Sequence, residues 1–170
     1  GAGHALADMV RLWRERRHPR PDLTGWWQRV EEWRAKRSLS FPESRSEIMP
    51  QRAIRALWEA THARAPIITT EVGQHQMWAA QHFQFDRPNH WLTSGGLGTM
   101  GYGLPAAVGA QVAHPDALVI DIAGEASTLM NIQELGTIAQ YRLPVKLFIL
   151  NNEYMGMVRQ WQELLHESRY

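Results

Sequence analysis

The chain has 170 residues, of which 44% are hydrophobic and 21% are charged, and its formal net charge is +1. These values are typical of an ordinary globular protein and give no reason to expect nucleic acid as a partner. The absence of cysteine excludes disulfides and thiolate metal sites. No apolar run approaches the ~20 residues of a membrane span. Residues 1–9 lack the basic and apolar regions of a signal peptide, so we expect a cytoplasmic protein without a membrane partner.

Residues 1–49 differ in composition from the rest of the chain. They hold four of the eight tryptophans, and nine of the 18 Lys and Arg residues lie within residues 11–37. Basic residues interleaved with aromatics can indicate nucleic-acid binding. The helical spacing of the apolar residues favours two amphipathic helices that dock on a core, separated by Pro19 and Pro21. The two apolar faces consist of Ala5, Met9, Leu12 and Trp13, and of Trp26, Val30 and Trp33. We therefore expect a helical linker segment over 1–49 and a second domain over 50–170.

The second domain alternates predicted strands with predicted helices. Short apolar runs, typical of buried parallel strands, predict strands at Ile67–Thr70, Trp91–Ser94, Leu118–Ile122 and Val145–Leu150. Helices are predicted from Pro50, over Leu104–Ala113, over Gly156–Leu165, and through the spaced apolar residues Leu129, Ile132, Leu135, Ile138 and Ala139. Strands that alternate with helices indicate an α/β fold, an open parallel sheet flanked by helices.

Polar residues follow two of these strands directly. Gly124–Ser127 follows the third strand, and Asn151–Glu153 follows the fourth. Open parallel sheets bind ligands at the carboxyl ends of their strands. The oxygens of Glu125 and Asn152 suit Mg²⁺, and a helix that begins near Ala126 offers free N–H groups to a phosphate. The alternative is an N-cap serine, a solvated glutamate and a turn-forming asparagine pair.

A glycine-rich segment supplies a rival interpretation. Residues 96–101 match the G-x-G-x-x-G pattern, and Asp121 lies twenty residues after Gly101, where a dinucleotide-binding fold places its ribose-binding acid. Asp121 lies inside an apolar strand, however, and such a fold has no use for a metal pair at Glu125 and Asn152. Met100 within this segment is either a core residue or an apolar wedge beneath a ligand. His75 and His82 are candidate bases, although a histidine is more often a structural group.

Three longer segments of the sequence resemble one known family. Residues 73–82, 93–107 and 155–162, together with the acid and asparagine after neighbouring strands, resemble the catalytic subunit of acetolactate synthase (acetohydroxyacid synthase). The similarity is dense from about Pro66 to the last residue. The resemblance implies a thiamine-diphosphate-binding fold that this chain leaves incomplete at its C-terminus.

The resemblance also implies roles for individual residues. It assigns Mg²⁺ to the side chains of Glu125 and Asn152 and the backbone carbonyl of Tyr154, and it assigns the diphosphate to Gln81 and His82. The rest of the implied site comprises Gly98 and Met100 beside the cofactor rings, Gly124, Ala126, Ser127, Gly156 and Met157 in the cofactor wall, and Trp161 in the substrate channel. Among these, Met100, Met157 and Trp161 are the implied catalytic residues. The family usually has Asp where this chain has Glu125.

The activity implied by the resemblance joins two pyruvates, or pyruvate and 2-oxobutyrate, with loss of CO₂, in isoleucine and valine biosynthesis. The implied cofactors are thiamine diphosphate and Mg²⁺, with FAD in the full-length family. The implied partners are further copies, as a dimer or tetramer, and a regulatory subunit. Because the flavin domain and a catalytic glutamate of another domain are missing here, we expect the isolated chain to be inactive. The alternatives are an inert cofactor-binding fragment and a nicotinamide (NAD)-dependent oxidoreductase.

Overall fold

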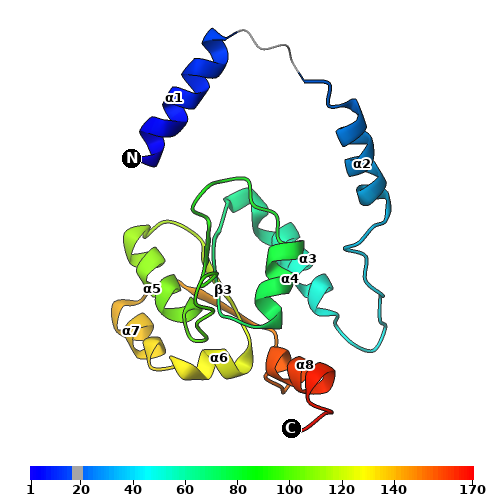
Figure 1. Ribbon diagram of the computed structural model, residues 1–170. Helices are drawn as coiled ribbons and strands as arrows, with labels where there is room; N and C mark the ends of the chain where they lie inside the picture. The colour runs from blue at the N-terminus through cyan, green and yellow to red at the C-terminus, as the bar shows by residue number, and fades with distance from the viewer. Residues whose placement is uncertain (17–20) are drawn as a thin grey trace. The chain divides into compact units, whose positions relative to one another are not determined.

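The computed structural model describes residues 1–16 and 21–170 and divides into two compact units, residues 1–40 and 41–170 (Figure 1). The segment 41–49, which we assigned to the linker, thus belongs to the second unit. Pro19, together with Arg17 and Arg20 of the basic cluster, lies outside the described residues.

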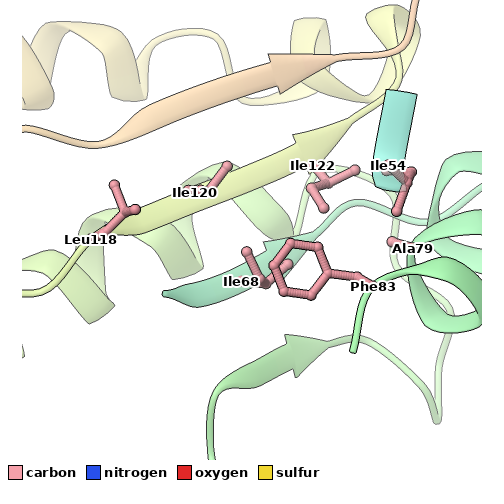
Figure 2. Close-up of a cluster of buried hydrophobic side chains, with 7 residues drawn as sticks. All are labelled: Ile54, Ile68, Ala79, Phe83, Leu118, Ile120 and Ile122. Carbon is pink, nitrogen blue, oxygen red and sulfur yellow. The ribbon is translucent and has the colours of Figure 1, made fainter. Parts of the chain in front are cut away.

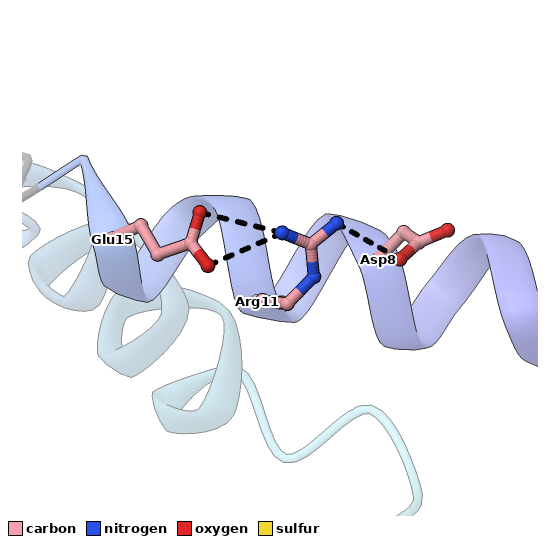
Figure 3. A network of polar contacts seen from close by, with 3 residues as sticks. All are labelled: Asp8, Arg11 and Glu15. Carbon is pink, nitrogen blue, oxygen red and sulfur yellow. Dashed lines mark hydrogen bonds and ion pairs between the residues drawn. The ribbon is translucent and has the colours of Figure 1, made fainter.

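The first unit consists of the two predicted helices, α1 (Ala2–Glu15) and α2 (Thr24–Ala35). On α1, Arg11 bonds Asp8 at 3.2 Å and Glu15 at 3.2 Å, one helical turn away on either side (Figure 3). On α2, the Trp26 and Trp33 rings meet edge to face with centroids 5.8 Å apart. Neither helix contains a buried residue. Docking of their apolar faces on a core therefore stays a prediction.

The second unit contains a four-stranded, fully parallel sheet, which confirms the predicted fold class. Its strands are β1 (Ile67–Thr70), β2 (Trp91–Thr93), β3 (Val119–Ala123) and β4 (Lys146–Ile149), in the order β2-β1-β3-β4. The helices are α3 (Pro50–Thr61), the short 3₁₀ helix η1 (His62–Arg64), α4 (Gln74–His82), α5 (Gly103–Ala113), α6 (Glu125–Met130), α7 (Glu134–Tyr141) and α8 (Gly156–Leu165).

Side chains that alternate along β1 and β3 build two cores on opposite faces of the sheet. Ile68 and Ile122 pack with residues of α3 and α4 on one face (Figure 2). Ile67 and Val119 pack with Ala107 and Ala110 of α5 on the other face. Figure 1 shows α5 and α4 on opposite sides of β3. The small residues of α5 let this helix lie close to the sheet.

The strand β4 differs from its prediction as a buried strand. It pairs only with β3, and Lys146 and Ile149 are exposed. Its apolar run is half-buried because β4 forms one edge of the sheet within the described residues.

The single helix predicted between the last two strands is also wrong, because α6 and α7 are separate. The backbone leaves the helical conformation at Asn131, whose φ is −130° and ψ 32°. The side-chain amide of Asn131 donates a hydrogen bond to the carbonyl of Gly101, thirty residues earlier. This long-range bond fixes the break beside the glycine-rich segment.

No helix among the described residues is both long and apolar enough to cross a membrane.

Candidate functional site

A cavity of about 260 Å³ lies where β1, β3 and β4 end. Four connections line it. The β1–α4 connection contributes Val72–His75, the glycine-rich segment contributes Gly98 and Met100, and the β3–α6 connection contributes Gly124–Ser127. The β4–α8 connection contributes Asn152 and residues 154–158, with Trp161 on α8. The cavity therefore lies at the carboxyl edge of the sheet, as predicted for a ligand site in this architecture.

Most of the residues that the resemblance assigned to a site line this one cavity. They are Gly98, Met100, Gly124, Glu125, Ala126, Ser127, Asn152, Tyr154, Gly156, Met157 and Trp161. The first and the last of them, Gly98 and Trp161, are 63 residues apart in the sequence, and the fold brings them together.

Gln81 and His82 do not line the cavity. They lie at the C-terminal end of α4, whereas the cavity is at its N-terminal end, about 10 Å away at 1.5 Å per residue. The His82 ring is buried and contacts the Phe41 ring edge to face at 5.6 Å. Burial, followed by the nearby Arg55 charge, lowers the His82 pKa. His82 therefore packs at the C-terminal end of α4, and the diphosphate contact that the resemblance implied for Gln81 and His82 stays a prediction.

Gln74 and His75 lie at the N-terminal end of α4, next to the cavity. Both line the cavity, and His75 is only 7% exposed. Burial lowers the His75 pKa to about 4, although a hydrogen bond with the Glu71 backbone offsets part of the effect. The His75 ring is therefore neutral at pH 7, and its buried Nε2 has no partner. A ligand with hydrogen-bonding oxygens would satisfy that atom.

Two glycines let the polar side chains of the cavity approach the backbone. A Cβ at Gly124 would lie 2.9 Å from His75 Nδ1. A Cβ at Gly156 would overlap the Gln74 amide and lie 3.2 Å from Asn152 Nδ2. A side chain at either position would displace the ring of His75 or the amide of Gln74 from its observed place. The glycines that follow β3 and β4 thus make room for the polar wall.

The local structure agrees with one part of the alternative interpretation of the polar clusters and contradicts another. Ser127 is not an N-cap, because it lies within α6 and its hydroxyl donates to the Gly124 carbonyl at 3.1 Å. The asparagines do form turns, since Asn151 Oδ1 accepts the Glu153 N–H at 2.9 Å and Asn152 Oδ1 accepts the Tyr154 N–H at 3.2 Å. This turn places the Asn152 oxygen and the Tyr154 backbone on the same short segment.

Glu125 and Asn152 offer a cation one carboxylate and one amide oxygen at the same cavity. Glu125 opens α6 and is half-buried, and Asn152 follows β4. No group of three or more His, Asp or Glu side chains that could hold a metal occurs among the described residues. This donor set fits Mg²⁺, which takes one or two protein carboxylates and completes its octahedron with phosphate oxygens and water.

Asp121 does not lie where a ribose-binding acid would be needed. Its side chain is fully buried on β3, accepts a hydrogen bond from Thr69 Oγ1 at 2.9 Å, and does not line the cavity. The glycine-rich segment therefore lacks the acid of a dinucleotide site.

The cavity has a carboxylate and an amide at the ends of two adjacent strands, with glycines beside both. This arrangement is typical of a domain that binds a phosphate-containing cofactor through a metal ion. Residues 71–170 match the family described as thiamine pyrophosphate enzyme, C-terminal TPP binding domain. The chain belongs to this family, which replaces the nicotinamide-dependent interpretation.

Within that class, the chain is similar to acetolactate synthase large subunits. It is 51% identical over 168 residues to the one from Parasynechococcus marenigrum, covering 99% of this chain and 27% of that protein. It is 47% identical over 149 residues to the one from Haemophilus influenzae, covering 88% and 26%. It is 47% identical over 152 residues to the isozyme 3 large subunit from Escherichia coli, covering 89% and 26%. The chain thus spans about a quarter of the length of these relatives.

Proposed function

We propose that this chain is the thiamine-diphosphate-binding part of an acetolactate synthase. The observation that carries the proposal is the meeting of Glu125, Asn152, Gly98 and Met100 in one cavity, from three different connections. The acetolactate synthase large subunits that share about half of its residues support the particular enzyme. The whole enzyme would condense two pyruvates, or pyruvate and 2-oxobutyrate, in isoleucine and valine biosynthesis.

The residues present fit the proposed cofactor. The side chains of Glu125 and Asn152 and the Tyr154 carbonyl would ligate Mg²⁺, which in turn would bind the diphosphate. Gln74 and His75 would contact the diphosphate, because the His75 Nε2 atom is buried and lacks a partner. When bound, thiamine diphosphate supplies an electron sink for loss of CO₂ from a 2-oxo acid.

The apolar residues of the cavity would hold the cofactor rings and exclude water. Met100 and Gly98 lie on the glycine-rich segment, and Met157 and Trp161 lie on α8. Gly98 has φ +68°, a conformation that favours glycine and lets bare backbone approach a ligand. We propose Met100, Met157 and Trp161 as the residues that orient the reacting part of the cofactor and the substrate.

The length of the Glu125 side chain affects how well the proposed site can fit Mg²⁺. Glutamate extends its carboxylate one methylene further than the aspartate that the resemblance leads us to expect. Mg²⁺ tolerates little departure from octahedral geometry. We therefore expect Glu125→Asp to keep or improve Mg²⁺ affinity and Glu125→Ala to weaken it strongly.

The remaining features belong to the proposed whole enzyme. They are cytoplasmic location, assembly as a dimer or tetramer, a regulatory subunit, and FAD on a domain outside this chain.

Metal-dependent binding of thiamine diphosphate tests the proposal. The chain is titrated with the cofactor in the presence of Mg²⁺ and again in the presence of EDTA, and binding is followed by calorimetry and by tryptophan fluorescence. Trp78 and Trp161 line the cavity, so we expect quenching that requires Mg²⁺. NADH serves as the control ligand. Equal binding with EDTA, or quenching by NADH alone, would overturn the proposal.

A further inference from the structure

Two buried carboxyl groups do not line the cavity and take no part in the proposed metal site. Glu71 directly follows β1, and Asp121 lies on the neighbouring strand β3. Both side chains are 0% exposed. One oxygen of each, Glu71 Oε2 and Asp121 Oδ2, is buried without a hydrogen-bond partner. Unsatisfied buried polar atoms of this kind are uncommon and need an explanation.

The other oxygens of the two groups bind the structure around them. Glu71 Oε1 accepts the backbone N–H of Leu104 at 3.0 Å, in the first turn of α5. Asp121 Oδ1 accepts the Thr69 hydroxyl at 2.9 Å. Gly103 lies against the Asp121 carboxyl group and the Glu71 backbone, because a Cβ at this position would overlap Asp121 Oδ1 and lie 2.7 Å from the Glu71 backbone nitrogen. The pair thus fixes the start of α5, three residues after Met100.

The same pair is connected to the opposite wall of the cavity. The His75 ring, which lines the cavity, donates a hydrogen bond to the Glu71 backbone carbonyl. The glycine-rich segment is fixed a second time by the bond from the Asn131 amide to the Gly101 carbonyl. Movement of Glu71 would therefore displace both the segment that carries Met100 and the wall that carries His75.

The described surroundings supply no cation for two negative charges. The strand β2 and helix α5 carry no titratable residue. Helix α4 carries His75 and His82, whose pKa values are both lowered by burial, and β4 carries Lys146, whose side chain is exposed. Burial, followed by the Glu71 charge, raises the Asp121 pKa to about 7. A like charge beside a buried carboxyl group disfavours its ionisation, which favours the protonated form of Asp121.

We propose that Asp121 and Glu71 hold one proton between them, and that this acid–carboxylate pair positions the glycine-rich segment for ligand binding. A proton on Asp121 makes its carboxyl group a donor, and Asp121 Oδ2 and Glu71 Oε2 are the two oxygens of the pair that otherwise have no partner. Loss of the proton leaves two buried negative charges, which separate and release the start of α5. Glu71 and Asp121 are positioning residues, because neither lines the cavity.

The shared proton is tested without any cofactor. The chain is labelled with ¹³C at the aspartate carboxyl groups, and each signal is titrated with pH by NMR. We expect one aspartate to titrate near pH 7 and this signal to be absent in Asp121→Asn. Asp116→Asn, in an exposed turn before β3, is the matched control and should leave the signal unchanged. Titration of every aspartate below pH 5 would overturn the proposal.

The positioning role rests on the proposed function and has its own test. The Kd of thiamine diphosphate is measured at saturating Mg²⁺ at pH 6 and pH 8. With a pKa of about 7, about a tenth of the molecules keep the proton at pH 8, so the Kd should rise about tenfold.

Asp121→Asn keeps one hydrogen-bond donor in the pair at every pH. Its Kd should therefore be equal at the two pH values, whereas Asp116→Asn should follow the parent chain. Asp121→Ala should bind weakly at both, and circular dichroism checks that each variant is folded. A tenfold rise that persists in Asp121→Asn would contradict the positioning role. Absence of any binding with an intact NMR titration would instead contradict the proposed function.

Discussion

The histidine at the cavity shows what residue-level sequence reasoning reaches and what it misses. Gln74-His75 and Gln81-His82 are the same dipeptide, seven residues apart. Seven residues are about two helical turns, so both pairs project from the same side of α4. The resemblance assigned the diphosphate to Gln81 and His82, whereas in the structure Gln74 and His75 are the pair at the end of α4 that meets the cavity. A signal existed in the position of Gly73–His75 directly after a strand.

His75 and Asp121 have opposite effects on stability as pH changes. The folded-state pKa of His75 is lowered from 6.5 to about 4, so the unfolded chain binds the extra proton in that window. Stability from His75 is thus present above pH 6.5 and lost as pH falls toward 4. Asp121 is raised from 3.8 to about 7, so its contribution is present below pH 4 and lost as pH rises toward 7. Between about pH 4 and 6.5, the free energy of unfolding therefore rises with pH through His75 and falls with pH through Asp121.

Single variants should separate these two slopes. We expect the free energy of unfolding of Asp121→Asn to rise from pH 4 to 6.5 relative to the parent chain, by up to about 1.4 kcal/mol per pH unit. His75→Asn should show the opposite change over the same range. Urea unfolding at a series of pH values measures both. Parallel curves for the two variants would contradict the assigned protonation states.

At the scale of elements, local patterns predicted the strands and missed one break. The strands were predictable because β1 and β3 are short apolar runs covered on both faces. The division between α6 and α7 was not, because it depends on the bond from Asn131 to Gly101. Periodicity reports which residues share a helical face, and it carries no information about a partner thirty residues away.

The close packing of α5 on the sheet can be tested by substituting two glycines of this helix. Gly103→Ala should destabilise the chain by more than about 1 kcal/mol, because its Cβ would meet Asp121 and backbone atoms of β1. Gly109→Ala is the matched control, since nothing lies within 4 Å of its added Cβ. It should stabilise the helix by up to about 1 kcal/mol. Thermal unfolding measures both changes, and equal effects would contradict the close packing of Gly103.

At the scale of the molecule, the second unit leaves much apolar surface exposed. Ile149 on β4 and Leu164 and Leu165 on α8 are exposed, as are Leu129 and Leu135 on α6 and α7. Exposed apolar surface of this extent marks an interaction site or a liability to aggregation. The chain also spans only about a quarter of the length of its relatives. Its sequence therefore predicted the residues of a cofactor site but not a complete set of catalytic residues.

We expect the purified 170-residue chain to form no acetolactate from pyruvate, Mg²⁺ and thiamine diphosphate. The proposed catalytic set lies at one rim of the sheet, and no candidate for the missing catalytic glutamate was found in the sequence. A colorimetric assay for acetoin after acidification measures the product, and a full-length acetolactate synthase large subunit serves as the positive control. Product formation by the chain alone would show that it is a complete catalyst.

The sharing of one Mg²⁺ by Glu125 and Asn152 is the central claim, and a double-mutant cycle tests it most directly. The Kd of thiamine diphosphate is measured by calorimetry in Mg²⁺ for the parent chain, Glu125→Ala, Asn152→Ala and the double variant. Residues that bind the same ion are coupled, so the double variant should lose little more affinity than the worse single variant. It should also no longer respond to EDTA. Losses that simply add, or a double variant that keeps its Mg²⁺ dependence, would contradict the account.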